Sequence, residues 1–142
     1  MFEGQKPLKL TAAKAGANLT ATTVQYKFVK MSADNTVVLC AAATDHPVGV
    51  LQAPVAAAGD PVDVVVAGET FLQADAALAF GYGVGTSADG QAAHYESSIT
   101  GGAQNIYYLA GMVVNVAGGT TAGNLVTAVI NCTNMPLATL GV

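Results

Sequence analysis

The stretch Thr36–Leu72 reads TVVLCAAATDHPVGVLQAPVAAAGDPVDVVVAGETFL, and it decides the fold class. It contains three short apolar runs rich in valine, separated by Asp45-His46-Pro47 and by Gly59-Asp60-Pro61. Short runs of β-branched residues bounded by Gly, Pro and Asp are typical of strands in a small all-β domain. No catalytic group stands out within the stretch. It therefore indicates a protein that builds and presents a surface.

Similar runs flank this stretch on both sides. Apolar and polar residues alternate from Val24 to Met31, which predicts a half-buried strand followed by a turn at Ser32–Asn35. The remaining predicted strands cover residues 36–41, 48–52, 62–66, 69–72, 83–87, 91–95, 106–116 and 125–132, with a break at Gly68 and a hairpin turn at Ala88-Asp89-Gly90. Eight or nine short strands at regular spacing favour a sandwich or a barrel.

One short helical turn is expected within this β pattern. Asp75 precedes the run AALAF, and Gly81 follows it. Asp is a favoured N-cap residue, and Gly commonly lies just past a helix end. The polar loop 96–105 and the tail from Thr133 are expected to carry no strand.

The composition is unusually poor in charge. Charged residues make up 10% of the 142 residues and hydrophobic residues 52%, whereas an ordinary soluble domain carries roughly 25% charged residues. This shortage suggests that much of the surface is covered by other subunits or is made of small residues. No run approaches the roughly 18 apolar residues that span a bilayer, and the start MFEGQKPLKL lacks the apolar block of a secretory signal. We therefore expect no secretory route and no membrane partner.

The few charges are distributed unevenly. Five lysines and one glutamate give residues 1–30 a net charge of +4, and eight acidic residues give residues 31–142 a net charge of −8. A basic segment on an acidic body suggests that the segment meets an acidic surface, either on a neighbouring copy or on another partner. Chance segregation in a sparsely charged chain is the alternative.

The first 22 residues show no sustained period and are predicted to form an extended arm. Pro7 biases its neighbour toward an extended conformation, and Gly16 disfavours a helix. Fully extended, such an arm reaches about 70 Å, which is enough to cross a neighbouring subunit. The predicted organisation is an N-terminal arm over residues 1–22 and a single β domain over residues 23–142.

The sequence carries no recognisable catalytic, cofactor or metal site. Cys40 and Cys132 are far apart in sequence and are expected to be buried free thiols. Neither His46 nor His94 has a metal-ligating residue at a suitable spacing, and GYGVG at residues 81–85 lacks the cation and the helix start of a phosphate loop. With no arginine and an acidic body, the chain is not expected to bind nucleic acid, and no small-molecule substrate is expected.

The order of these runs resembles small phage capsid decoration proteins, also called cement proteins. The resemblance is carried by YKFVKMSADNTVVLCA, ATDHPVGVLQ, GDPV, VDVVVAGE and ADAALAFGYGVGTSADGQA, which together cover Tyr26–Ala93, with a less specific continuation through IYYLAGMVVNV. It implies an all-β, compact β-barrel-like or β-tulip-like domain with one short helical turn and an extended N-terminal arm.

The resemblance also implies a function and partners. It implies a homotrimer on the outer surface of a phage head, a virion location, and a major capsid protein of the HK97 type as the partner. The protein would then be non-enzymatic and would stabilise contacts between capsomers. The arm matches the strap of such proteins, and its expected contact residues are Phe2, Lys6, Pro7, Leu8, Lys9, Leu10 and Lys14.

A second function remains open from the sequence. The chain could be a small trimeric β domain of a phage fibre or host-attachment device that binds glycans. Its stacking residues would be Tyr82, Tyr95, Tyr107 and Tyr108, although core or interface roles also suit these tyrosines.

Overall fold

The computed structural model describes residues 6–94, 108–117 and 121–133. These residues form ten strands and one 3₁₀ helix: β1 Leu8–Lys9, β2 Lys14–Ala15, η1 Thr22–Val24, β3 Phe28–Ala33, β4 Thr36–Leu39, β5 Gly49–Leu51, β6 Val64–Gln73, β7 Gly83–Thr86, β8 Ala92–His94, β9 Gly111–Asn115 and β10 Leu125–Asn131. The all-β prediction is confirmed. No helix in the described ranges is long and apolar enough to cross a membrane.

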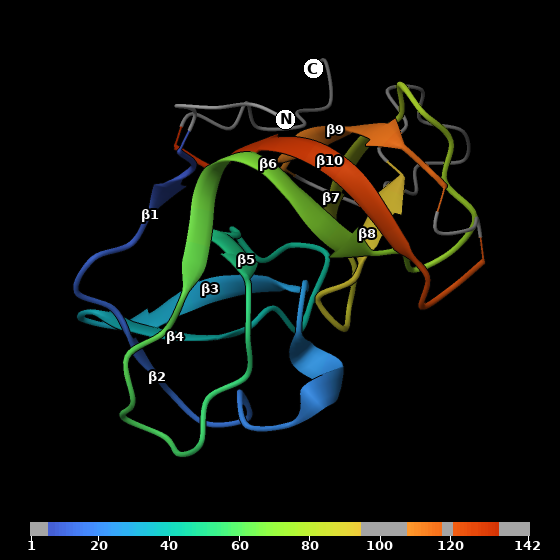
Figure 1. Cartoon of the computed structure of the whole chain (residues 1–142). Helices are drawn as coiled ribbons and strands as arrows, with labels where there is room; N and C mark the ends of the chain where they lie inside the picture. Colours follow the sequence, from blue (N-terminus) through green and yellow to red (C-terminus); the bar gives the residue numbers. More distant parts are fainter. Residues whose placement is uncertain (1–5, 95–107, 118–120, 134–142) are drawn as a thin grey trace, which may run out of the picture.

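The strands form one mixed sheet in the order β2-β4-β3-β5-β6-β10-β9-β7-β8, and β1 pairs with β6 outside this path. Among the strand pairs of the described residues, β2 with β4 is parallel and the others are antiparallel. The prediction of a barrel was wrong, because β2 and β8 lie at the two ends of the order and do not pair with each other. The sheet instead folds over itself, and β6 passes from one half to the other (Figure 1).

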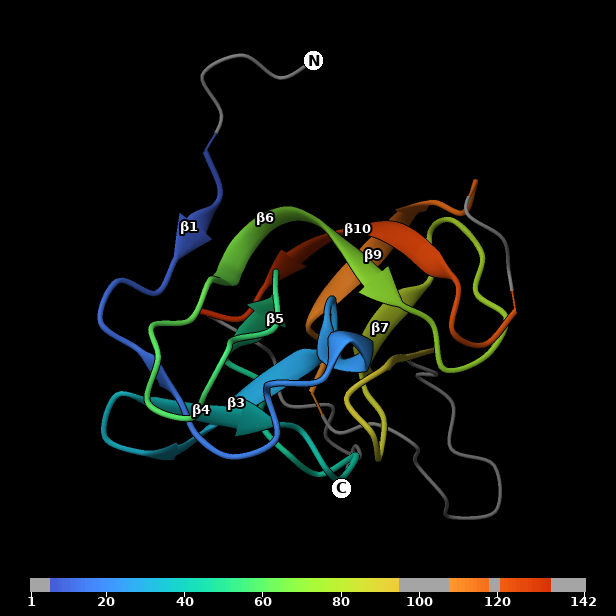
Figure 2. The same ribbon diagram turned by 60° about the horizontal axis from the view of Figure 1, so that its bottom comes forward.

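The long strand β6 connects the two halves and arches over the core (Figure 2). Its start pairs with β5 at Val64 and Val65, and Ala67–Gln73 pairs with β10. The predicted break at Gly68 was wrong, because glycine takes a backbone φ of 129° there without ending the strand. Pro7 occupies the space where a side chain would begin, with its Cβ 3.0 Å from the position of an added Cβ.

The core consists of two buried clusters, and the larger one lies between the halves. The larger contains Phe28 and Val50 from one half together with Val84, Val113 and Ile130 from the other. The smaller lies beneath the N-terminal residues and includes Ala15, Leu19 and Val24. The N-terminal residues therefore contribute to the core well before residue 23.

Two local predictions were wrong because distant backbone groups compete with local structure. The helical turn at residues 75–81 is absent: the Asp75 N–H donates to the Ala92 carbonyl at 2.9 Å and the Gly81 N–H to the Val113 carbonyl at 2.7 Å. These bonds hold the segment as bends and turns. The strand predicted from Val24 begins only at Phe28, because Tyr26 adopts a φ of 63°.

Other local predictions are confirmed. Asp34 and Asn35 form the turn between β3 and β4, with Asn35 at a φ of 52°. The hairpin around Asp89-Gly90 joins β7 to β8, with Thr86 opposite Ala92. The predicted strand at 125–132 is β10. The predicted loop at 96–105 lies outside the described residues, as does the tail beyond Thr133.

Substitution of Gly68 tests the bend of β6. Gly68→Ala should lower the free energy of unfolding by about 1–2 kcal/mol, because an L-residue is strained at positive φ and its Cβ would meet Pro7. Urea unfolding measures the change. Gly59→Ala is the control: Gly59 has a φ of 92°, but nothing lies within 4 Å of an added Cβ. Equal losses in the two variants would mean that the Pro7 contact is unimportant.

Candidate functional site

The expected arm residues are divided by the structure into two groups. Lys6, Pro7, Leu8 and Lys9 are exposed, and Leu8 retains 55% of its accessible surface. They run beside β6, where Leu8 lies opposite Ala67. Phe2, the remaining apolar residue expected to make contact, lies outside the described residues.

From Leu10 onward the chain belongs to the body of the domain. Leu10 is half-buried and packs against both core clusters. Lys14 is exposed, but its backbone is fixed because its N–H donates to the Asn35 carbonyl at 2.7 Å. The next residue, Ala15, is buried in the smaller cluster. The exposed segment beside β6 therefore ends at Lys9.

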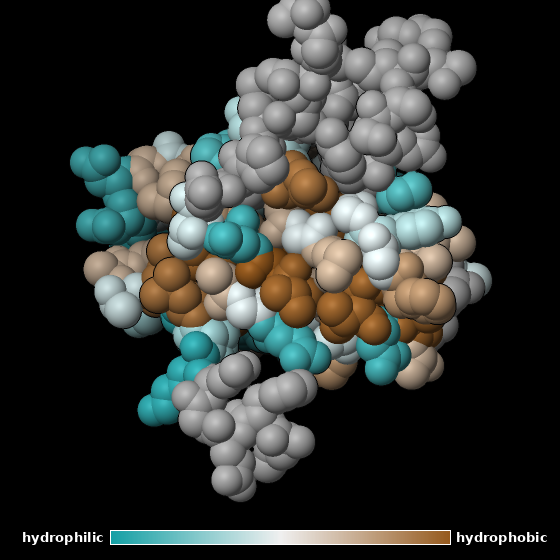
Figure 3. All heavy atoms as spheres, turned by 90° about the horizontal axis from the view of Figure 1, so that it is seen from above, coloured by the Kyte–Doolittle hydropathy of each residue, from teal (hydrophilic) through white to brown (hydrophobic). Residues whose placement is uncertain are grey.

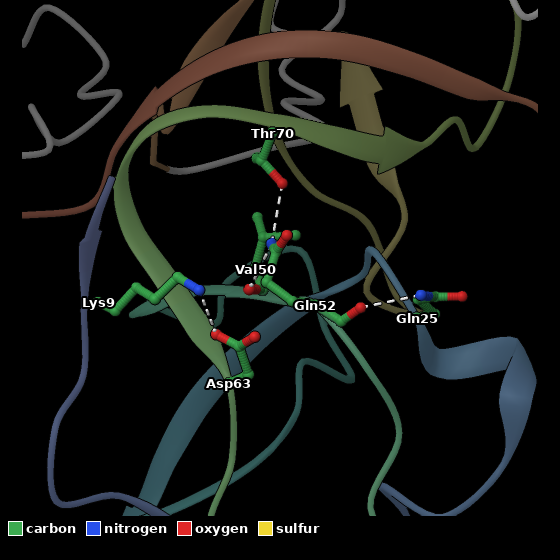
Figure 4. Close-up of polar contacts among 6 residues, drawn as sticks. All are labelled: Lys9, Gln25, Val50, Gln52, Asp63 and Thr70. Atoms are coloured by element: carbon green, nitrogen blue, oxygen red, sulfur yellow. Dashed lines mark hydrogen bonds and ion pairs between the residues drawn. The ribbon is translucent and has the colours of Figure 1, made fainter. Parts of the chain in front are cut away.

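One ion pair fixes this segment to the body. Lys9 Nζ lies 2.9 Å from Asp63 Oδ1, with both side chains about half exposed (Figure 4). Exposed pairs of this kind contribute about 0–1 kcal/mol. The basic arm and the acidic body therefore meet within one chain at this point. The charge distribution had suggested such a contact between neighbouring copies or with another partner.

A groove of about 580 Å³ lies between this segment and β6. It is lined by Lys6, Pro7, Tyr26, Gln52, Gly68, Glu69, Thr70, Phe71 and Thr127. The rings of Tyr26 and Phe71 meet edge to face with centroids 5.4 Å apart. The side-chain amide of Gln52 donates to the Thr70 hydroxyl at 2.9 Å. The main-chain carbonyl of Gln52 accepts a hydrogen bond from the side-chain amide of Gln25 at 2.9 Å (Figure 4). The wall is therefore partly aromatic and partly a fixed polar network.

A second feature is an apolar band on the outer face of β6, β10 and β9. Phe71, Val129, Met112 and Val114 point outward there and are 48%, 47%, 49% and 39% exposed. Val129 lies opposite both Glu69 and Met112 in the strand register, so the band crosses neighbouring strands. Figure 3 shows hydrophobic side chains gathered across this face. A sheet face that met only water would normally be polar, so this band indicates an interaction surface.

The tyrosines expected to stack on glycans have partners. Tyr82 stacks on His94 with centroids 3.8 Å apart, and Tyr108 stacks on His46 at 4.5 Å. One face of each ring is therefore occupied by a histidine. Tyr95 and Tyr107 lie outside the described residues.

The described residues bring no reactive groups together. They contain no group of three or more His, Cys, Asp or Glu side chains able to hold a metal ion. Cys40 and Cys132 are free and buried, as predicted. Burial raises the pKa of both thiols to about 12, so neither is a thiolate near neutral pH.

Asp45 accepts several hydrogen bonds, and its role is structural. Its Oδ2 accepts the N–H groups of Ala41 and Ala42 at 2.7 and 2.9 Å and lies 2.9 Å from Lys30 Nζ. Burial by itself would raise the pKa of Asp45, but these hydrogen bonds and the lysine charge together hold it below the ordinary value. Asp45 therefore closes the loop after β4 rather than facing a partner.

Sequence reasoning identified the exposed arm but missed the groove and the apolar band. A signal for the band was present: β10 includes the apolar Val129, whose side chain points outward, between the buried Ala128 and Ile130. A strand that is apolar on both faces indicates a covered outer surface. The groove left no such signal, because its walls come from distant parts of the chain.

Comparison with known proteins gives a likeness to a solved structure. No protein-family model matches the sequence, and no curated protein matches it significantly. The structure resembles a solved structure described as the head fiber gp8.5 N base of bacteriophage phi29, with a TM-score of 0.58 and 22% sequence identity. The match covers 87% of this chain and 94% of that chain. The two chains therefore share a fold over nearly their whole lengths.

The hydrogen bonds and the ion pair of Asp45 should make the free energy of unfolding depend on pH in the acid range. The pKa of Asp45 is lower than its ordinary value of 3.8, so the carboxylate stabilises the fold above that value, and this contribution is lost as the pH falls through the lower folded value. Asp45→Asn should be less stable than wild type at neutral pH and should lose less stability between roughly pH 5 and pH 3. Urea unfolding across this range measures both effects. Asp34→Asn, at an exposed turn residue, is the control, and parallel profiles for wild type and Asp45→Asn would contradict the prediction.

Proposed function

We propose that this chain is a non-enzymatic structural protein of a phage head, which attaches to the outer surface of the capsid. The observation that carries the proposal is the shared fold with the phi29 head fiber base, which extends over 94% of that chain. The sequence resemblance to capsid decoration proteins supports the same location independently. The proposed partner is a major capsid protein of the HK97 type.

We propose that the N-terminal arm makes the main contact with the capsid. Phe2, Lys6, Pro7, Leu8, Lys9, Leu10 and Lys14 remain the proposed contact residues. Within this set, Lys6–Lys9 are the described residues best placed for the role because they are exposed. Leu10 and Lys14 would act mainly by fixing the direction in which the arm leaves the body.

We propose that the apolar band joins copies of the chain into a homotrimer. The band is made of half-exposed side chains on three adjacent strands, and its charged neighbour is Glu69. A trimer attached to the capsid at three points would gain roughly 10²- to 10⁴-fold in apparent affinity over one contact, provided that the geometry allows all three. Such multiple attachment would stabilise contacts between capsomers.

A fibre component is the second candidate function. It is favoured by the description of the similar structure as the base of a head fiber. In this case the chain would be the capsid-bound base, and the stacked Tyr82 and Tyr108 would stabilise the domain rather than bind glycans. Electron microscopy of virions distinguishes the two candidates: a decoration protein gives compact density on the head, and a fibre base carries a projection.

Truncation of the arm tests the contact with the capsid. Deletion of residues 1–7 should abolish binding to empty heads without removing the buried residues Ala15 and Leu19. Leu8→Ala should weaken binding at least about tenfold, since full burial of a leucine contributes about 1.5–3 kcal/mol. Lys6→Ala should mainly reduce the salt dependence, since an exposed ion pair contributes about 0–1 kcal/mol.

Co-sedimentation with empty heads over a range of salt concentrations measures these effects. Circular dichroism of each variant is the folding control. Unchanged affinity after deletion of residues 1–7 would remove the arm from the proposed contact.

A charge placed in the apolar band tests the trimer. Val129→Lys should convert the trimer to monomers, because the lysine would have to be buried at the contact without a partner. Analytical ultracentrifugation measures the mass. Ala58→Lys introduces the same charge in an exposed loop and is the matched control. Trimers that persist in Val129→Lys would exclude the band as the subunit contact.

A further inference from the structure

The backbone of β6 has one edge that faces away from β10. The Val66 carbonyl accepts the Cys132 N–H at 2.9 Å, and the Ala74 N–H donates to the Asn124 carbonyl at 2.9 Å. Even-numbered residues of β6 thus bond toward the β10 side. Because the main-chain groups of successive residues point to opposite edges of a strand, those of Glu69 and Phe71 face the other edge.

This second edge is paired at both ends and open in the middle. At one end Val50 of β5 lies opposite Val65, and the Gln52 N–H donates to the Asp63 carbonyl at 2.8 Å. At the other end the Gln73 N–H donates to the Tyr26 carbonyl at 3.0 Å. In the part of the chain that the structure describes, no strand pairs with Glu69 or Phe71 on this side.

Three main-chain groups remain available along the open edge. The Phe71 carbonyl accepts the Thr70 hydroxyl at 3.2 Å, and Gln52 fixes that hydroxyl in place. The N–H of Phe71 and both the N–H and the carbonyl of Glu69 have no such partner among the described residues. The open edge therefore presents a short segment of a β ladder to an incoming strand.

The groove of about 580 Å³ runs along this open edge. Val65 and Gln73 are eight residues apart, so the edge between its two covered ends is about 27 Å long at about 3.4 Å per residue. Pro7, Tyr26 and Gln52 line the groove together with Glu69 and Phe71. The space suits a short extended segment of about four residues and not a helix, whose diameter with side chains is about 10–12 Å.

The side chains at the edge specify the chemistry of the incoming segment. Glu69 forms no ion pair with a described lysine, since the pairs in that part of the chain are Lys9 with Asp63 and Lys30 with Asp45. The half-exposed Phe71 ring lies two residues farther along the same face. Residues directly opposite in a ladder have adjacent side chains. A basic residue opposite Glu69 and an apolar residue opposite Phe71 would complement the edge.

We propose that the open edge of β6 binds an extended segment of the capsid protein by β-strand addition. This inference rests on the proposed function and names how the capsid is recognised. In this mode, main-chain hydrogen bonds provide affinity and alternate side chains provide specificity. The bound segment carries a basic and an apolar residue two positions apart. It lies beside Lys6 and Pro7, so arm and groove form one continuous contact surface.

A proline at position 69 tests the main-chain hydrogen bond separately from the charge. Glu69→Pro removes an N–H that does not bond to β10, whereas Glu69→Ala removes the same charge and keeps the N–H. Both variants should bind empty heads more weakly than wild type. The proline variant should bind at least about tenfold more weakly than the alanine variant, because it also loses a ladder hydrogen bond. Circular dichroism and urea unfolding check that both variants fold.

Hydrogen exchange gives a second measurement that needs no variant. Mass spectrometry should show slower exchange in a peptide spanning Glu69–Phe71 when wild-type protein is bound to empty heads. Equal affinities of the two variants together with unchanged exchange would overturn strand addition while the proposed function stands. Slow exchange in the free protein that becomes fast on deletion of residues 1–5 would also overturn it, since the chain would then fill its own groove. Failure of wild type to bind heads would count against the proposed function itself.

Discussion

The fold depends on the continuity of β6 through its bend at Gly68. The strand pairs with β5 at its start and with β10 over the rest of its length, so both halves of the sheet are connected through a single backbone. A residue with a side chain would be strained at this φ and would also collide with Pro7. Because the bend turns one half over the other, the larger core cluster contains residues of both, from Phe28 to Ile130. The same bend leaves a stretch of β6 edge that no described strand covers.

Much of the strand order along the chain was predictable from local chemistry. The turns at Asp34-Asn35 and Asp89-Gly90 were predicted correctly, because Asn and Gly adopt left-handed backbone conformations that the surrounding residues disfavour. The helical turn after Asp75 failed for the opposite reason. Its local signals were sound, but the Asp75 N–H bonds to the distant Ala92, and an isolated turn offers little to offset such a bond. Gly68 was misread as a break because glycine takes a φ of 129° without interrupting the pairing of β6 with β10.

The interaction surfaces were predictable to different degrees. The charge distribution alone pointed to an N-terminal contact segment, and the structure places Lys6 and Lys9 on the surface. The apolar band could have been predicted from Val129 and Phe71. Once the residues of each strand that face the core are assigned, these two apolar side chains fall on the opposite face. The groove could not have been predicted, because Pro7, Tyr26 and Gln52, which line it beside β6, are far from β6 in the sequence. No local pattern encodes the space between such distant segments.

The two surfaces on β6 are linked by the geometry of a strand. The side chains of residues 69 and 71 lie on the outer face, and their main-chain N–H and carbonyl groups lie at the open edge. In a strand, side chains point out of the plane of the sheet and main-chain groups lie within that plane. A contact between copies through the Phe71 ring would therefore hold the backbone beside it in place. A strand added at the edge would meet a backbone that is already ordered and would lose less conformational entropy on binding. If the chain assembles as proposed, trimer formation and strand addition should accordingly favour each other.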